Sequence, residues 1–200
     1  MVQLRFGGGR KKGKIVNLRI IAGSLGGRTI VAPDGSRTHP MSERIRNALF
    51  NSLGTAVNGA TVLDAFAGTG AVGIEAISRG ADHVTFIERD RLAQKVLAEN
   101  IATLKIQNQT KLIRASVAAW VDTYDGPKFD LIFADPPYHD TQFSTVLLLI
   151  GLLKPSALMV LSHPGRSESP TLPGVVVVDN RGYGDASLTY FRLGNNEESA

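Results

Sequence analysis

The segment Asp135-Pro136-Pro137-Tyr138 carries the most specific chemical signal in the sequence, because it follows directly on the apolar run FDLIFA. Its two prolines stiffen a turn and remove two N–H donors, which leaves the Asp135 carboxylate and the Pro136 carbonyl as acceptors. The exocyclic amino group of a nucleobase is a planar double donor, so two rigid acceptors can fix both of its hydrogens. Tyr138 can stack on the face of the same base. The segment therefore predicts a site that holds an amino nitrogen toward a methyl donor, with Asp135 able to receive the proton.

A glycine loop earlier in the chain predicts where that donor binds. Gly68, Gly70 and Gly73 satisfy the G-x-G-x-x-G pattern between an apolar strand and a helix, but this pattern alone is weak evidence for a dinucleotide. Asp64 stands four residues ahead of Gly68, where a carboxylate would repel a pyrophosphate but attract an ammonium group. Glu88 follows Gly68 by twenty residues, the spacing at which an acid reaches ribose hydroxyls. A ligand with a ribose and an ammonium group but no phosphate is S-adenosylmethionine, which we therefore expect as the methyl donor.

Strands that alternate with helices must position these residues. The expected strands cover 61–66, 83–88, 111–115, 129–135 and 156–163, and the helices between them run to Arg79, from Asp90 to about Leu104, through Trp120, and from about Thr141 to Leu153. This alternation predicts a parallel sheet with helices on both faces. Two more strands, 175–180 and 187–193, have only a glycine turn between them. We expect an α/β fold whose mostly parallel seven-stranded sheet ends in an antiparallel hairpin.

Residues 19–54 form an expected appendage to this body. The stretch 18–32 has two apolar runs around a glycine-rich turn and predicts a β-hairpin that carries Arg19 and Arg28. Ser42 can cap a following helix, which Gly54 ends. Residues 1–46 hold ten Lys or Arg against two acids, whereas residues 47–200 hold twelve against sixteen. A basic end on a mildly acidic body is expected where that end approaches a polyanion.

Composition and length exclude several classes of protein. The 200 residues favour one domain, and 43% hydrophobic with 20% charged residues is an ordinary globular balance. The chain has no cysteine, which excludes disulfides, thiolate metal sites and a cysteine nucleophile. The start MVQLRFGGGRKKGK lacks the apolar stretch of a signal peptide, and the longest apolar run, 146–150, is too short to cross a bilayer. We expect a cytoplasmic protein, and its isolated histidines predict no metal site.

The motifs together resemble those of a known family. The glycine loop with D-P-P-Y resembles the class I S-adenosylmethionine-dependent amino-methyltransferases, which have a Rossmann-like fold. More narrowly, RIIAGSLGGR at 19–28, SERIRNALFN at 42–51 and DAFAGTGAVGIEAISRGA at 64–81 resemble the bacterial family that methylates guanine N2 in small-subunit (16S) ribosomal RNA. The similarity runs from about Arg19 to Leu193.

This resemblance implies a role for each matching residue. The implied cofactor-binding residues are Asp64, Phe66, Gly68, Thr69, Gly70, Glu88, Arg89 and Ser116. Of these, Glu88 would hold the ribose and Ser116 would lie beside the adenine. Asp135, Pro136, Pro137 and Tyr138 would form the catalytic site around the guanine. Arg19, Arg28, Arg44 and Arg46 would bind phosphates of the RNA.

The implied organisation is one methyltransferase domain at 19–193, with a catalytic core at 60–193. Residues 1–18 would be a basic, flexible extension and residues 194–200 a loose tail. The implied partner is 16S ribosomal RNA or an assembling small ribosomal subunit, and we expect a monomer that does not bind membranes.

Two other functions stay open. D-P-P-Y recognises an amino group rather than a particular ring, so adenine N6 of DNA or of another RNA is an alternative target. About 50 residues of hairpin and helix leave little room for the larger target-recognition region expected of a DNA enzyme. The second alternative is a non-catalytic RNA-binding module for ribosome assembly, against which the intact Glu88 and Asp135 argue.

Overall fold

A seven-stranded sheet forms the body of the protein. The computed structural model describes residues 15–33, 41–140, 142–165 and 170–194. The strand order is β5-β4-β3-β6-β7-β9-β8. Its strands are β3 (Thr61–Asp64), β4 (His83–Ile87), β5 (Thr110–Ile113), β6 (Phe129–Ala134), β7 (Leu153–Pro164), β8 (Val175–Gly182) and β9 (Ala186–Leu193). The first five run parallel, and β9 is antiparallel to both β7 and β8. The predicted fold class is confirmed.

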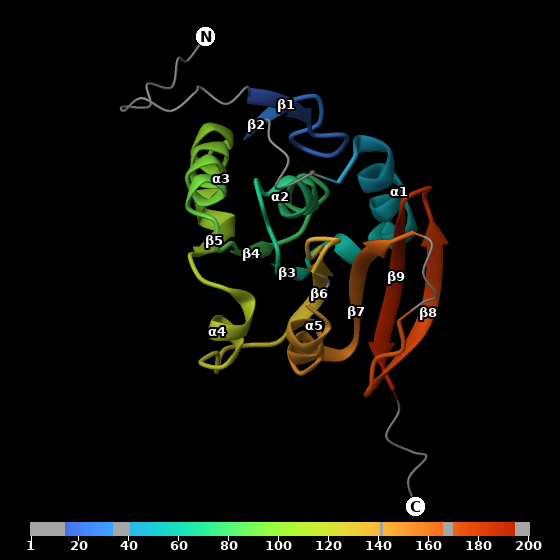
Figure 1. The fold of residues 1–200 in the computed structure, drawn as a ribbon. Coiled ribbons are helices and arrows are strands. Elements are labelled where there is room, and N and C mark those ends of the chain that lie inside the picture. Colours follow the sequence, from blue (N-terminus) through green and yellow to red (C-terminus); the bar gives the residue numbers. More distant parts are fainter. Residues whose placement is uncertain (1–14, 34–40, 141, 166–169, 195–200) are drawn as a thin grey trace, which may run out of the picture.

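Helices cover both faces of this sheet (Figure 1). They are α1 (Glu43–Leu53), α2 (Ala71–Ser78), α3 (Arg91–Leu104), α4 (Val117–Val121) and α5 (Phe143–Ile150), with 3-10 turns η1 (Gly54–Val57) and η2 (Gln107–Gln109). Ser42 caps α1 and Asp90 caps α3, as their residue types predict. None of the described helices is long and apolar enough to cross a membrane.

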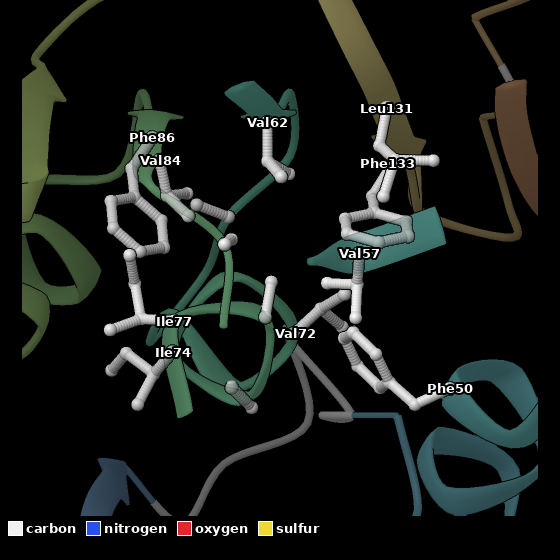
Figure 2. Close-up of a cluster of buried hydrophobic side chains, with 14 of the residues drawn as sticks. Phe50, Val57, Val62, Val72, Ile74, Ile77, Val84, Phe86, Leu131 and Phe133 are labelled. Atoms are coloured by element: carbon white, nitrogen blue, oxygen red, sulfur yellow. The ribbon is translucent and has the colours of Figure 1, made fainter. Parts of the chain in front are cut away.

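Two apolar clusters fill the space between the sheet and the helices. Successive strand residues point to opposite faces, so Val62 and Phe133 pack on the side of α1, α2 and α3, whereas Leu63 and Ile132 pack on the side of α4 and α5. Figure 2 shows the first cluster, in which side chains of α2 and of the central strands meet Phe50 of α1. The near-continuous apolar runs of these strands reflect burial on both faces.

Most element boundaries differ from the sequence expectation by one or two residues, and two differences are larger. Helix α5 ends at Ile150 and Leu153 already belongs to β7, because β7 begins with an irregular stretch in which Ser156 has a positive φ of 64° and the pairing register with β6 shifts. At the other end of the chain, β1 (Ile15–Arg19) begins inside the expected flexible extension and pairs with β2 (Thr29–Pro33). The rest of that extension, residues 1–14, and residues 195–200 of the expected tail at 194–200 lie outside the described residues.

The hairpin loop between β1 and β2 is docked on α2 rather than free in solvent. Buried Glu75 of α2 accepts hydrogen bonds from the backbone N–H groups of Ile21 (2.8 Å) and Ala22 (3.1 Å). The backbone N–H of Ser24 donates to the Ser78 carbonyl at 2.7 Å. A Cβ on Gly23 would lie 1.7 Å from that carbonyl oxygen, so only glycine permits this contact.

Arg46, expected to bind RNA, instead belongs to this interface. Its side chain is 2% exposed and donates to the carbonyls of Arg19 and Met41, with Nε 3.8 Å from a Glu75 oxygen. The position of Arg46 on α1 explains why it is buried. Arg46 falls on the helix face that also buries Leu49 and Phe50, whereas Arg44 is exposed. Arg46 therefore holds the hairpin to α1 and cannot reach a phosphate.

Replacing Arg46 by alanine is expected to lower the free energy of unfolding by about 2–4 kcal/mol, because Glu75 and two backbone carbonyls lose a buried partner. Arg44→Ala, two residues away and exposed, should change it by less than about 0.5 kcal/mol. Urea unfolding of both variants measures the difference. Equal stabilities of the two variants would contradict the assignment of Arg46 to the fold.

Candidate active site

Three carboxylates meet at one edge of the sheet. Asp64 ends β3, Glu88 follows β4 and Asp135 follows β6, and these three strands are neighbours that run parallel. The carboxyl ends of parallel strands lie on the same side, which is where ligands bind in open α/β sheets. All three residues line one cavity of about 800 Å³.

The glycine loop forms one wall of this cavity. Gly68 and Gly70 both have positive φ, 53° and 83°, which explains glycine at each. A Cβ on Gly70 would lie 2.3 Å from Leu97, and one on Gly73 would lie 2.2 Å from Phe86, so packing alone demands these two glycines. A Cβ on Gly68 would meet nothing within 4 Å. Gly68 is therefore the glycine that leaves open space beside the cavity.

Asp64 is the most deeply buried of the three acids, at 2% exposed. Its Oδ2 accepts from the Gly73 N–H at 2.9 Å, so a strand residue caps the first turn of α2. Burial raises the pKa of Asp64 to about 7; the Gly73 bond opposes this rise, and the charges of Asp135 and Glu88 add to it. A cation in the cavity would favour the ionised form of Asp64.

The Glu88 carboxylate is held by two backbone N–H groups. Oε2 accepts from Gly68 N–H at 2.7 Å and Oε1 accepts from Asp90 N–H at 2.6 Å. Burial raises the pKa of Glu88 above its usual value, and these backbone bonds oppose the rise. Each carboxylate oxygen has a second lone pair, so Glu88 can still accept from a pair of ligand hydroxyls.

Asp135 and Tyr138 are tied together by Ser162, a buried residue of β7. The Tyr138 and Ser162 hydroxyl oxygens are 2.8 Å apart. Burial raises the pKa of Asp135 to about 6, and a hydrogen bond from the Ser162 side chain opposes that rise. In the Tyr138–Ser162 pair either hydroxyl can be the donor. Tyr138 is nevertheless 41% exposed, so its ring remains accessible.

The structure brings most of the expected site residues into the same cavity. Its lining includes Asp64, Phe66, Gly68, Thr69, Glu88, Arg89, Ser116, Asp135, Pro136, Pro137 and Tyr138. Gly70 is not among the lining residues, because it is turned into the packing between α2 and α3. Ser116 uses its hydroxyl to cap α4, accepting from Ala119 N–H at 3.3 Å. Within the described part of the chain, no group of three or more possible metal ligands occurs.

The expected RNA-binding arginines lie outside the cavity. Arg19, Arg28 and Arg44 are exposed. The guanidinium of Arg28 already makes hydrogen bonds within the protein. It donates to the carbonyls of Thr103 at 3.1 Å and Leu104 at 3.5 Å, at the end of α3. This placement is favourable for a cation because the free carbonyls at a helix C-terminus carry partial negative charge.

Sequence reasoning missed several cavity residues. Ser162 lines the cavity, as do Tyr183 and Asp185 in the turn between β8 and β9 and Ile45 on α1. Ser162 follows the apolar run of a strand parallel to β6, so the rule about carboxyl ends of strands could have found it. Nothing local marks Tyr183, Asp185 or Ile45, because sheet order and the docking of α1 bring them there.

Comparisons with known proteins identify the family of this chain. A model of the protein family described as conserved hypothetical protein 95 matches residues 18–192. The chain belongs to this family. It is 34% identical over 159 residues to the ribosomal RNA small subunit methyltransferase D of Escherichia coli K12, which covers 78% of this chain and 79% of the relative. The family resemblance predicted from the sequence is therefore confirmed.

Solved structures of this family and beyond show the same architecture. The Escherichia coli protein yhhF superposes with a TM-score of 0.80 at 30% identity, covering 89% of this chain and 98% of that one. A Streptococcus mutans protein described as a SAM-dependent methyltransferase superposes with a TM-score of 0.70 at 13% identity, covering 94% of this chain and 57% of that one. The second likeness concerns the fold alone, which is that of the class I methyltransferases.

Replacing Asp64 by asparagine is expected to stabilise the ligand-free protein at pH 8 but not at pH 4. The folded-state pKa of Asp64, about 7, lies above its unfolded value, so ionisation costs stability as pH rises through this interval. Asparagine keeps an acceptor for Gly73 and removes the charge. The free energy of unfolding at pH 8 should therefore rise by on the order of a few kcal/mol. Thermal unfolding of the wild type and the variant at both pH values measures this difference in stability. A stabilisation independent of pH would contradict the raised pKa of Asp64.

Proposed function

We propose that the protein transfers a methyl group from S-adenosylmethionine to the exocyclic N2 of a guanine in small-subunit ribosomal RNA. The relatives named as ribosomal RNA small subunit methyltransferases support an rRNA methyltransferase. The observation that carries methyl transfer to an amino group is the rigid turn of Asp135, Pro136 and Tyr138 in the same cavity as Gly68 and Glu88. The choice of guanine rests on the family resemblance. One cavity can thus hold a methyl donor and an amino group side by side.

The cavity residues fit S-adenosylmethionine. This donor carries an ammonium and a sulfonium group, and five acidic residues line the cavity, among them Asp64, Glu88 and Asp135. When bound, it supplies an electrophilic methyl group. Gly68 leaves space for close approach of the ligand, Glu88 has lone pairs free for ribose hydroxyls, and Asp64 gains a cation that favours its ionised form. Ser116 and Arg89 also line the cavity, and the adenine is expected beside Ser116.

Positioning accounts for most of the proposed catalysis. The Asp135 carboxylate and the Pro136 carbonyl accept the two hydrogens of the guanine N2 amino group, and Tyr138 stacks on the ring. The nitrogen then forms the new bond to the methyl carbon as the carbon–sulfur bond breaks. Asp135 stabilises the positive charge that develops on nitrogen and can receive the proton. Its pKa of about 6 leaves it largely ionised at pH 7.5 and close enough to accept that proton.

The RNA is proposed to approach from the side of the hairpin and α1. Arg19 and Arg44 are exposed cations of this appendage, and Ile45 of α1 lines the cavity itself. Phosphate contacts of this kind position the substrate without reading its sequence. The target nucleotide must leave its stack to enter the cavity.

The product of the reaction tests the proposal directly. Unmodified small ribosomal subunits, free ribosomal RNA and duplex DNA are each incubated with methyl-labelled S-adenosylmethionine, and the methylated nucleoside is identified by mass. N2-methylguanosine from the ribosomal substrates alone is expected. Asp135→Ala should reduce the rate by at least about 100-fold while cofactor affinity stays within about threefold.

The alternatives correspond to other outcomes of this assay. N6-methyladenine would keep the mechanism of the site and refute the guanine assignment. Cofactor binding with no product from any substrate would favour the RNA-binding module. Equal loss of cofactor affinity and rate in Asp135→Ala would show that Asp135 belongs to the cofactor site.

The pH profile tests the proposed role of Asp135 separately. The value of kcat/KM should fall below pH 6, because protonation removes the acceptor. Ser162→Ala removes the bond that opposes the rise in pKa of Asp135. The acid limb of this variant's profile, where kcat/KM falls with falling pH, should therefore move to higher pH. Ser52→Ala, which removes a hydroxyl that pairs with the Tyr190 hydroxyl outside the cavity, serves as the control and should leave the limb in place. If the acid limb of Ser162→Ala lies at the same pH as that of the wild type, this account of Asp135 is contradicted.

A further inference from the structure

One buried side chain joins the hairpin to the glycine loop. Asn100 of α3 is 3% exposed. Its Oδ1 accepts from the Val31 N–H of β2 at 3.0 Å, and its Nδ2 donates to the Val31 carbonyl at 3.0 Å. The same Nδ2 also donates to the carbonyl of Thr69 at 3.1 Å. Thr69 lies between Gly68 and Gly70, so a single amide bonds both the RNA-side appendage and the wall of the cavity.

The contact uses the outward edge of the hairpin. Val31 stands opposite Asn17 in the β1–β2 pairing, yet both its N–H and its carbonyl bond to Asn100. The free edge of β2 is therefore covered by α3. Arg28 holds the hairpin to the same helix at its C-terminal end, through the Thr103 and Leu104 carbonyls. These two anchors make α3 a fixed support for the hairpin.

The Asn100 amide cannot readily exchange these hydrogen-bond partners for others. Both of its hydrogens and one oxygen lone pair are used, and the site is buried, so a lost bond leaves a polar group without compensation. Movement of Thr69 away from Asn100 would release one hydrogen, and movement of Val31 would release the other. Order in the glycine loop and order in the hairpin therefore favour each other.

We propose that Asn100 is a positioning residue that couples occupancy of the cavity to the order of the hairpin. A ligand that fixes the glycine loop then stabilises β2 through Asn100. By reciprocity, RNA that fixes the hairpin tightens the loop around the donor. This inference rests on the proposed function for the identity of the ligands, and its geometry is independent of which base is methylated.

Hydrogen exchange of the ligand-free and ligand-bound full chain tests the coupling. The probe is S-adenosylhomocysteine, the demethylated form of the donor. Binding is expected to slow exchange in a peptide covering 66–72 and, through Asn100, to slow it about fivefold or more in a peptide covering 28–33. In Asn100→Ala and in Asn100→Leu, whose side chain is close in shape to asparagine but has no polar atoms, the first effect should persist and the second should fall below about twofold.

A neighbouring substitution separates coupling from general loss of stability. Ile101→Ala removes a buried side chain from the same turn of α3 but keeps the Asn100 amide. In Ile101→Ala, binding of the ligand should still slow exchange in the peptide covering 28–33. Thermal unfolding shows which variants remain folded, and Asn100→Leu, which leaves a smaller cavity, preserves the test if Asn100→Ala does not fold.

The outcomes distinguish this inference from the proposed function. Protection of the loop without any change in the wild-type hairpin would refute the coupling and leave the proposed function intact. An equal loss of the hairpin response in Ile101→Ala would also refute it, because stability alone would then explain the effect. No protection of the loop itself would refute the proposed cofactor and this inference together.

Discussion

Close packing of α2 against the sheet is the constraint on which both halves of the molecule depend. All eight residues of α2 are buried, and Gly73 brings the helix so near to β4 that a Cβ would overlap the Phe86 ring. This position fixes the loop before the helix, and with it the cavity wall at Gly68. It also presents Glu75 and Ser78 to the hairpin on the other side. One helix therefore determines where the cavity and the hairpin lie relative to each other.

The same packing sets the electrostatics of the cavity. Asp64 must lie under α2 to accept from Gly73, and that burial, together with Glu88 and Asp135, raises its pKa to about 7. Ionised carboxylates that share a buried site repel each other and lose hydration. The arrangement costs stability in the ligand-free protein, and a positively charged ligand would offset that cost. A cavity of this kind suits a cationic donor better than a phosphate.

Much of the fold follows from local sequence signals. Apolar runs separated by helical stretches, together with caps such as Ser42 and Asp90, predict the strand and helix order, because these signals act over a few neighbouring residues. The D-P-P-Y turn and the position of Glu88 likewise predict an amino-group site and a ribose site. Arg46 shows the limit of such reasoning. Its type and its neighbour Arg44 suggest a phosphate contact, but the rotation of α1 buries it against Glu75.

The sequence by itself determined the family, the order of the elements and the chemistry of the residues at the strand ends. Those properties depend on residue type, spacing and short-range backbone preference. Tertiary structure alone decided that Ser162 supports Asp135 and Tyr138, that Gly70 serves packing rather than the cavity, and that Asn100 joins Val31 to Thr69. Each of these contacts joins segments far apart in the chain. Which segments meet is set by sheet order and helix docking, and no local pattern records it.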